Sequence, residues 1–304
     1  MKILVTGSTG LVGTALVRKL AGAAHTVCRL MRSESAARQE TPGGFAVAWN
    51  PATGELGGAG VGADAVVNLS GASIAGGRWN AERKALLRSS RLDTTRALVA
   101  ALAKMNARPS VLVCASAIGI YGNRGDELLT EDSAIGSDFL AGLAKDWEAE
   151  AAKAEALGIR VVLARFGIIL ARHGGALAKM MLPFKFGAGG KIGSGRQWMS
   201  WVTLEDTVQI LRLALENAAV RGPVNVVAPN AARNSEFTRE LAKAMHRPAL
   251  FPAPAFALRL ALGEMADALL LSSQRVAPQK LQQLGYRFLH PDLATALSAI
   301  LSAG

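Results

Sequence analysis

Three glycines near the start of the chain, Gly7, Gly10 and Gly13, have the spacing that phosphate binding requires. They follow the apolar run Lys2–Thr6 and precede Thr14–Leu20, where apolar residues recur at helical spacing. Glycine permits a tight turn and lets the backbone approach a pyrophosphate, and a helix N-terminus offers free N–H groups with a partial positive charge. The turn therefore predicts a dinucleotide site with contacts from Gly7, Thr9, Gly10, Leu11, Val12 and Gly13.

The residues after the next strand-like segment, Thr26–Met31, indicate which dinucleotide binds. Sheets that bind NAD usually present Asp or Glu to the ribose hydroxyls at this point. Here the chain continues with Arg32 and Ser33, which offer no carboxylate. Because these side chains suit a 2′-phosphate, the sequence favours NADP as the cofactor. The alternative is that Arg32 is a solvated loop residue.

Strand-like and helix-like segments alternate along the first 170 residues, which is typical of a doubly wound parallel α/β sheet. We expect residues 1–170, joined by 203–228, to form the nucleotide-binding domain. Residues 171–202 and 229–304 then form a smaller, mainly helical C-terminal substrate domain. Besides the first strand and helix, the expected elements are strands at Thr26–Met31, Phe45–Trp49, Ala63–Leu69, Val111–Ala115, Arg160–Arg165 and Val224–Val227, and helices at Ala81–Met105, Phe139–Leu157 and Leu204–Glu216.

The composition excludes several classes of protein. Half of the 304 residues are hydrophobic and 19% are charged, so the chain can bury a large core and is not disordered. No apolar stretch reaches the roughly 18–20 residues of a membrane span, and no secretory signal precedes the first strand. Four scattered His and two Cys give no metal-ligand spacing. Cys28 and Cys114 lie in apolar runs, which predicts two buried thiols in a reducing compartment and a cytoplasmic protein.

The net charge of +11 raises the question of an anionic partner. Seven basic and two acidic residues lie between Arg78 and Lys104, and Lys84, Arg88, Arg91 and Thr95 fall on one face of the expected helix. A nucleic-acid partner is disfavoured because aromatic residues, on which bases stack, are only 5% of the chain. For Arg91, with Arg78 as a second candidate, the expected partner is the phosphates of a cofactor or an anionic substrate; a solvated helix face is favoured for Arg83, Lys84, Arg88 and Arg96.

Several motifs carry a resemblance to a known family. The glycine turn, Asn68-Leu69-Ser70-Gly71-Ala72 and Ala115-Ser116-Ala117-Ile118-Gly119-Ile120-Tyr121-Gly122 resemble segments of the extended, epimerase-like branch of the short-chain dehydrogenase/reductase superfamily. More specific pairs and motifs, which together resemble its atypical epimerase-family proteins with a dedicated C-terminal domain, are Arg78-Trp79, Ser90-Arg91, Trp147-Glu148, Gly174-Gly175, Gly193-Ser194-Gly195-x-Gln197-x-x-Ser200-Trp201 and Gln274-Arg275-Val276-x-Pro278.

This resemblance implies a Rossmann domain, a nicotinamide cofactor and a small polar or anionic substrate. It also implies that two copies of the chain pair through a four-helix interface. Arg91 falls where relatives often carry an amide beside the nicotinamide half of the cofactor. The other residues that the resemblance places at the cofactor are Leu69, Ser70, Gly71, Gly167 and Ile168.

The catalytic pair usual in that superfamily, Tyr-x-x-x-Lys, is absent. The only tyrosines are Tyr121 and Tyr286, and neither has Lys four residues later; the two positions are expected to hold Leu140 and Ala144. Three hypotheses remain open. Tyr121 supplies the phenol, with Ser116 as the hydroxyl that orients the substrate; or hydride transfer proceeds with water or the substrate exchanging the proton; or the protein binds NADP without turnover, as a sensor or interaction protein.

Overall fold

The computed structural model describes residues 1–31, 44–51, 53, 56 and 60–302. Its centre is a parallel sheet with the strand order β11-β7-β5-β4-β1-β2-β3. The predicted doubly wound α/β sheet is therefore confirmed. The strands are β1 (Lys2–Thr6), β2 (Thr26–Met31), β3 (Phe45–Ala48), β4 (Ala65–Asn68), β5 (Val111–Ala117), β7 (Arg160–Phe166) and β11 (Gly222–Val226).

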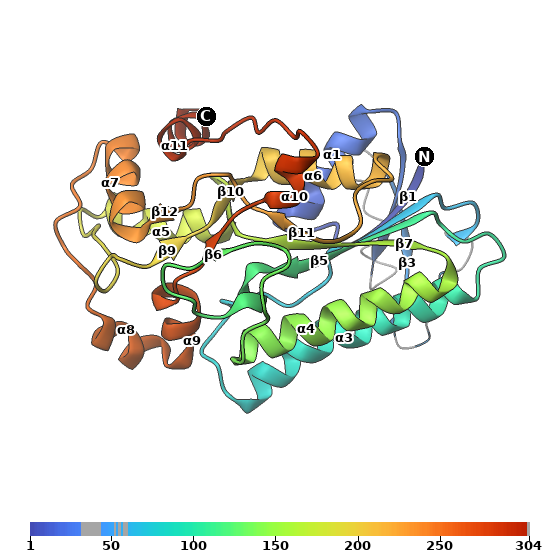
Figure 1. Ribbon diagram of the computed structural model, residues 1–304, viewed down its shortest axis with the longest axis horizontal. Coiled ribbons are helices and arrows are strands. Elements are labelled where there is room, and N and C mark those ends of the chain that lie inside the picture. Colours follow the sequence, from blue (N-terminus) through green and yellow to red (C-terminus); the bar gives the residue numbers. More distant parts are fainter. Residues whose placement is uncertain (32–43, 52, 54–55, 57–59, 303–304) are drawn as a thin grey trace.

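Helices cover both faces of this sheet (Figure 1). On one face lie α1 (Leu11–Gly22) and α6 (Leu204–Glu216), and on the other lie α3 (Ala81–Ala103) and α4 (Phe139–Ala152), which continues as a 3-10 turn over Lys153–Leu157. The central strands are apolar on both sides because both sides are buried. Val113 of β5 packs toward α6, and its neighbours Leu112 and Cys114 pack toward α3 and α4.

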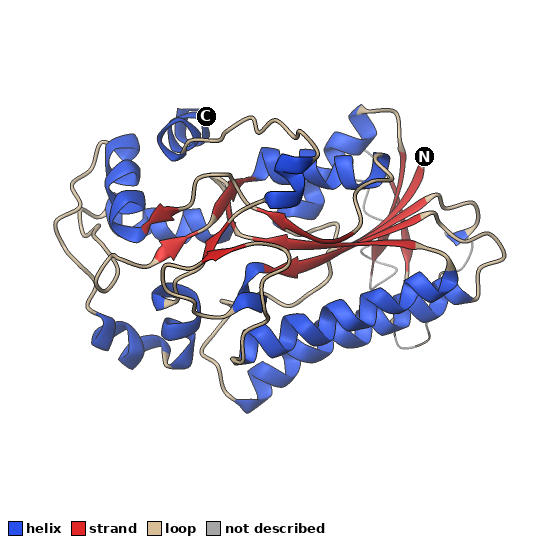
Figure 2. Cartoon of the chain, in the orientation of Figure 1, coloured by secondary structure: helices blue, strands red, loops and turns tan. Residues whose placement is uncertain are grey.

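The strand order reverses between β1 and β4, and this reversal positions the candidate site. From β1 the chain winds outward through β2 and β3, then crosses back to β4 and continues through β5, β7 and β11. Ligands of open α/β sheets bind beyond the carboxyl ends of the strands at such a point. In Figure 2 the arrow of β5 points toward the C-terminal elements, so this edge of the sheet faces the C-terminal region.

The C-terminal region adds short strand pairs and helices beside this edge. This region has an apolar cluster of its own, which includes Leu177, Phe237 and Leu297 from three different helices. The strand pairs are β8 (Ile168–Leu170) with β10 (Trp201–Thr203), β9 (Trp198–Met199) with β12 (Ala232–Arg233), and β6 (Leu128–Leu129) with β13 (Arg275–Val276). The helices are α5 (Gly175–Lys185), α7 (Asn234–Met245), α8 (Ala255–Leu262), α9 (Glu264–Ala266) with a π-helical turn over Asp267–Leu271, α10 (Gln279–Gln283) and α11 (Leu293–Ser302).

Side-chain hydrogen bonds attach the C-terminal segment to the rest of the chain. Ser200 Oγ accepts from Val276 N–H at 2.8 Å, and Gln197 Nε2 donates to Leu270 O at 3.0 Å. Asp206, in the first turn of α6, is fully buried and accepts from the N–H groups of Leu289 and His290. The motif residues around 193–201 therefore serve as structural anchors.

The two cysteines are free and buried, as expected. Burial raises the pKa of the Cys28 thiol to about 11 and that of Cys114 to about 12, so both remain protonated and unreactive at neutral pH. Within the described residues no helix has the length and apolarity needed to cross a membrane.

Candidate nucleotide site

The glycine turn adopts the geometry that only glycine allows. Gly7 has a φ of +65°, and a Cβ added there would lie 2.5 Å from Leu69 O. A Cβ on Gly13 would lie 2.2 Å from Gly7 O, so α1 could not pack this close to β1 with any larger residue. Gly10, which caps α1, differs: a Cβ there would meet nothing closer than 3.4 Å. Contacts within the protein therefore do not explain why residue 10 is glycine.

The N-terminus of α1 is open for an anion. No side chain caps it, and its first turn carries no acidic residue. Thr9 and Gly10 are exposed, and Leu11 and Val12 are half-buried at the same edge. Leu11 also contacts Gly174 and Gly175, where α5 begins. The structure thus brings the predicted turn residues together as a cradle for phosphate.

Buried hydrogen bonds fix the neighbouring strand end, β4. Asn68 accepts from the Thr6 hydroxyl at 2.7 Å and donates to the Thr95 hydroxyl at 2.8 Å, and Trp147 Nε1 also donates to Thr95. These bonds hold the segment Leu69-Ser70-Gly71 beside the glycine turn. Thr95 was expected on the basic helix face, but it is fully buried because it bridges Asn68 and α4.

Arg91 is the basic residue of α3 that reaches the site. Its guanidinium donates to Leu87 O and Ala72 O, lies 5.2 Å from the Trp147 ring centroid, and would be 3.1 Å from a Cβ on Gly71. Burial, with the nearby Arg83 charge, lowers the pKa of Arg91 to about 10, which leaves it cationic at neutral pH. No ion pair joins Arg91 to a carboxylate among the described residues.

The other basic residues of α3 form surface contacts. Lys84 pairs with Glu264, Arg88 with Asp146, and Arg96 with Asp93 and Glu150. Arg83 donates to Ser73 O. Arg88 and Arg96 are exposed, as a solvated face predicts, whereas Arg83 and Lys84 are half-buried like Arg91. Arg91 differs because its guanidinium lies beside Gly71 and the Trp147 ring.

Ser116 and Tyr121 belong to one buried network beyond the end of β5. The Ser116 hydroxyl donates to Glu148 at 2.6 Å, and both carboxylate oxygens of Glu148 accept from Arg165 at 2.8 Å. Tyr121 donates to Asn225 at 2.7 Å and accepts from Arg165 at 2.9 Å. Ser116 is 2% exposed and Tyr121 is 0% exposed, so in this arrangement both hydroxyl hydrogens point at partners inside the protein.

Burial and the network also set the protonation of these groups. Burial raises the pKa of Tyr121, although the Arg165 charge opposes this shift. Burial disfavours the charged form of Arg165, but the Glu148 hydrogen bonds and charge outweigh it and raise the pKa of Arg165. Glu148, Asn225 and Glu131, which complete this network with Arg165, come from other segments of the chain and were not predicted as site residues.

The positions expected for the missing Tyr and Lys are apolar. Leu140 lies against Gly119 at the end of β5, where a glycine Cβ would be 3.4 Å from Leu140 Cβ. Ala144 packs with Ile118 and Ile120 in a buried cluster. Lys145, the nearest lysine in the sequence, is exposed on the outer side of α4.

Gly167 and Ile168 lie at the end of β7, the nicotinamide end expected for them. A Cβ on Gly167 would be 2.6 Å from Ser200 O, and the N–H groups of both residues donate to Val226 O and Ser200 O. Any contact with a cofactor is therefore left to their carbonyls and, for Ile168, its side chain. Arg32, expected at the adenosine end, lies outside the described residues.

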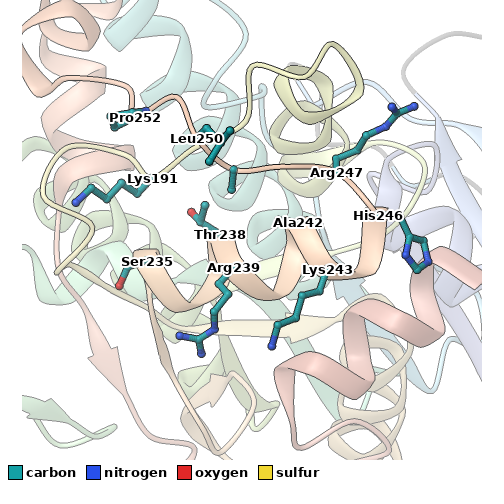
Figure 3. A pocket seen from close by; sticks show the side chains of 11 residues that line it. Lys191, Ser235, Thr238, Arg239, Ala242, Lys243, His246, Arg247, Leu250 and Pro252 are labelled. Atoms are coloured by element: carbon teal, nitrogen blue, oxygen red, sulfur yellow. The ribbon is translucent and has the colours of Figure 1, made fainter.

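Two cavities lie away from this edge. One, of about 950 Å³, lies between α7 and the segment 246–252; of its basic side chains, Arg239 and Lys243 extend from α7 in the same direction, whereas Lys191 and Arg247 extend in other directions (Figure 3). The other, of about 770 Å³, lies among α1, α6 and α11. The described residues contain no group of His, Cys, Asp or Glu that could hold a metal ion.

Comparison with known proteins identifies the family. The model of the NAD dependent epimerase/dehydratase family matches residues 3–228. The chain belongs to this family. A second model, a domain of unknown function (DUF1731), matches residues 253–300, which agrees with the dedicated C-terminal domain predicted from the resemblance.

Relatives match along nearly the whole chain. Epimerase family protein Mb2239 of Mycobacterium bovis is 42% identical, covering 97% of this chain and 96% of its own. The Arabidopsis thaliana epimerase family protein SDR39U1 homolog, named chloroplastic, is 38% identical, covering 99% and 87%. Among solved structures, human epimerase family protein SDR39U1 with NADPH is 34% identical, with a TM-score of 0.90 and full coverage of both chains.

A nucleoside-diphosphate sugar epimerase from Corynebacterium glutamicum is 33% identical, with a TM-score of 0.79; the match covers 99% of this chain and 58% of that one. These matches confirm the predicted family and its NAD(P)-binding Rossmann fold.

Proposed function

We propose that this member of the epimerase/dehydratase family binds NADP(H) and acts as an oxidoreductase or epimerase/dehydratase on a small molecule. The observation that carries the proposal is the glycine cradle at an uncapped helix N-terminus, with no acidic residue in its first turn. NADPH in the human SDR39U1 structure supports NADP as the cofactor. When bound, the nicotinamide would accept or supply a hydride at C4.

Different residues of the chain would hold different parts of the cofactor. Gly7, Gly10 and Gly13 and the α1 N-terminus would hold the pyrophosphate, with Thr9, Leu11 and Val12 at its sides. Arg32 would take the 2′-phosphate. Leu69, Ser70, Gly71 and Arg91 would line the nicotinamide half, with Gly167 and Ile168 closing its far end.

The proton that accompanies hydride transfer would be exchanged with water or with the substrate. Leu140 and Ala144 offer no ionisable group. Ser116 and Tyr121 were predicted as catalytic residues, and their hydroxyls are engaged with Glu148, Asn225 and Arg165. We therefore assign both residues to holding β5, α4 and β7 together.

A non-catalytic NADP-binding protein is the second candidate. It is favoured by the same buried hydroxyls, which leave the edge of the sheet without a free acid at the expected positions. Incubating the protein with NADPH and a carbonyl library separates the candidates: cofactor oxidation that depends on an added compound supports an enzyme, and saturable NADPH binding without turnover supports the sensor.

The remaining predictions concern the setting of the protein. The expected partner remains a small molecule, without nucleic acid or membrane. The expected compartment remains the cytoplasm. Pairing of two copies through a four-helix interface also remains a prediction, which sedimentation of the chain would test.

A further inference from the structure

A cluster of apolar side chains lies beyond the end of β5. Leu140, at the position expected for the catalytic phenol, belongs to this cluster. Its buried members come from α3, α4 and the C-terminal region, and its other members are only partly buried, so part of the apolar surface is accessible. The cluster comprises Trp79, Leu87, Leu143 and Met265, with Ala72, Ile74, Ala75, Leu92, Phe139, Leu140, Leu262, Ala268 and Leu269 packed against them.

Both halves of the molecule build this apolar wall. Leu262, Met265 and Leu269 come from α8, α9 and the π-helical turn, while Leu140 comes from α4. The ion pair between Lys84 and Glu264 ties α9 to α3 at the rim. The C-terminal region therefore contributes hydrocarbon surface to the place where a substrate would meet the nicotinamide.

Several polar side chains around the wall already have partners, although Arg83 Nε is buried without one. Ser90 Oγ accepts from Ala72 N–H and donates to Leu87 O, and Trp79 Nε1 donates to Ile74 O. Arg83 donates to Ser73 O, and Gln197 Nε2 donates to Ile192 O and Leu270 O. A sugar would need such groups free, because each hydroxyl buried without a hydrogen bond costs about 1–3 kcal/mol.

Apolar surface continues outward from the wall along α5. Lys179 of α5 donates to Ala75 O, which sets that face of the helix against the loop 72–79. Leu182 and Phe186 follow at three and seven residues, on the same side of the helix, and are 54% and 80% exposed. A ligand with a hydrocarbon body could be covered by this surface, with a gain of about 0.8 kcal/mol for each CH₂ buried.

We propose that the substrate of this site is a carbonyl compound or alcohol with a long hydrocarbon body, not the small polar or anionic compound that the sequence predicts. This inference rests on the proposed NADP(H) site, because the nicotinamide defines where the substrate lies. It deepens that function by naming the substrate class, and it accounts for leucine and alanine at the positions of the missing Tyr and Lys.

Saturation-transfer NMR on the protein loaded with NADPH tests the proposal, with decan-2-one and UDP-glucose as probes. We expect saturable transfer to decan-2-one and none to UDP-glucose. Leu140→Asn should weaken decan-2-one binding about tenfold without changing NADPH affinity. Leu269→Asn, on the opposite wall, should do the same, and Leu284→Asn, at an exposed position at the end of α10, should match the unmodified chain.

The outcomes separate this inference from the proposed function. If NADPH binds and UDP-glucose replaces decan-2-one as the ligand, or if neither wall substitution changes decan-2-one binding, the inference is overturned while the cofactor site stands. If NADPH itself fails to bind, the proposed function is wrong. Circular dichroism of each variant establishes that a lost signal reflects the wall and not unfolding.

Discussion

Arg91 is the residue for which the structure gives the sharpest expectation. Its side chain is half-buried, its cation lies beside Gly71, and its hydrogen bonds go only to backbone carbonyls. If it contacts a cofactor phosphate, Arg91→Met should raise the Kd for NADPH at least tenfold, since a charged hydrogen bond contributes about 1.5–3 kcal/mol. Arg88→Met is the matched control, because Arg88 pairs with Asp146 at the surface. Equal affinities for the two variants in a fluorescence titration would contradict the assignment.

A substitution at Tyr121 distinguishes a structural role of this residue from a catalytic one. Tyr121→Phe removes the hydrogen bonds to Asn225 and Arg165 inside the protein, so we expect the free energy of unfolding to fall by about 1–3 kcal/mol. NADPH affinity and any turnover per folded molecule should be unchanged. A variant with full stability and no turnover would instead restore the catalytic role predicted from the sequence. Denaturant titration and a substrate-dependent NADPH assay give the two readouts.

The sequence could locate such residues but not their partners. Ser116 and Tyr121 were identified because a hydroxyl at the end of a strand in this fold faces the ligand edge. Their actual partners, Glu148 and Asn225, are 32 and 104 residues away in the chain. Only the packing of α4 on the sheet and the pairing of β11 with β7, the neighbour of β5, bring these groups together, so one sequence could not distinguish a buried network from a catalytic pair.

At the scale of elements, two glycines of the turn before α1 are needed for different reasons, Gly13 for packing and Gly10 for binding phosphate. Gly13→Ala places a Cβ 2.2 Å from Gly7 O, so we expect a loss of about 1–3 kcal/mol in the free energy of unfolding. Gly10→Ala meets nothing closer than 3.4 Å and should leave stability unchanged, while weakening NADPH binding at least tenfold by keeping the phosphate from the backbone. Thermal unfolding and NADPH titration of both variants check this.

Gly22→Ala, in the last turn of α1 with no atom within 4 Å of the added Cβ, is the control for a methyl group in the same helix. It should leave binding unchanged and add about 0.5–1 kcal/mol of stability. If Gly10→Ala binds NADPH as tightly as Gly22→Ala does, the turn is not the phosphate site.

Long elements were predictable, and short ones were not. The buried strands β1 and β2 have the predicted bounds, as does α6, because a continuous apolar run or a strong helical period defines them. The helix expected over Phe139–Leu157 ends as an α-helix at Ala152 and finishes as a 3-10 turn. The two- and three-residue strands β6, β8, β9, β10, β12 and β13 were missed, since so few residues show no alternation.

At the scale of the whole molecule, the last segment is attached to the sheet layer through Tyr286 and Asp206. Tyr286 donates to Asp206 at 3.2 Å, and burial together with the Asp206 charge raises the pKa of Tyr286 above its ordinary value of 10.0. Above about pH 10 the unfolded chain loses this proton while the folded chain keeps it. The contribution of Tyr286 to the free energy of unfolding should therefore be fully present below about pH 10 and be lost as the pH rises further.

Urea unfolding between pH 9 and 11 measures this loss. Tyr286→Phe should make the decline shallower without abolishing it, because Tyr121 also has a raised pKa. An unchanged slope would mean that the C-terminal segment is not held in place by this phenol.

Part of the net charge of +11 can be placed at this scale. Three basic residues of α3, Lys84, Arg88 and Arg96, form ion pairs with carboxylates, so their charge is balanced locally. Arg91 is the exception that points inward, and the α1 N-terminus adds a second positive region at the same edge of the sheet. Both observations are consistent with a phosphate-bearing cofactor as the anionic partner.

The central claim is that this edge of the sheet binds NADP(H). The most direct test is a fluorescence titration of the full-length chain with NADPH and, separately, with NADH at the same ionic strength. We predict saturable binding of NADPH, with NADH at least tenfold weaker because it lacks the 2′-phosphate. Tighter binding of NADH would contradict the choice of cofactor, and no binding of either nucleotide would contradict the account as a whole.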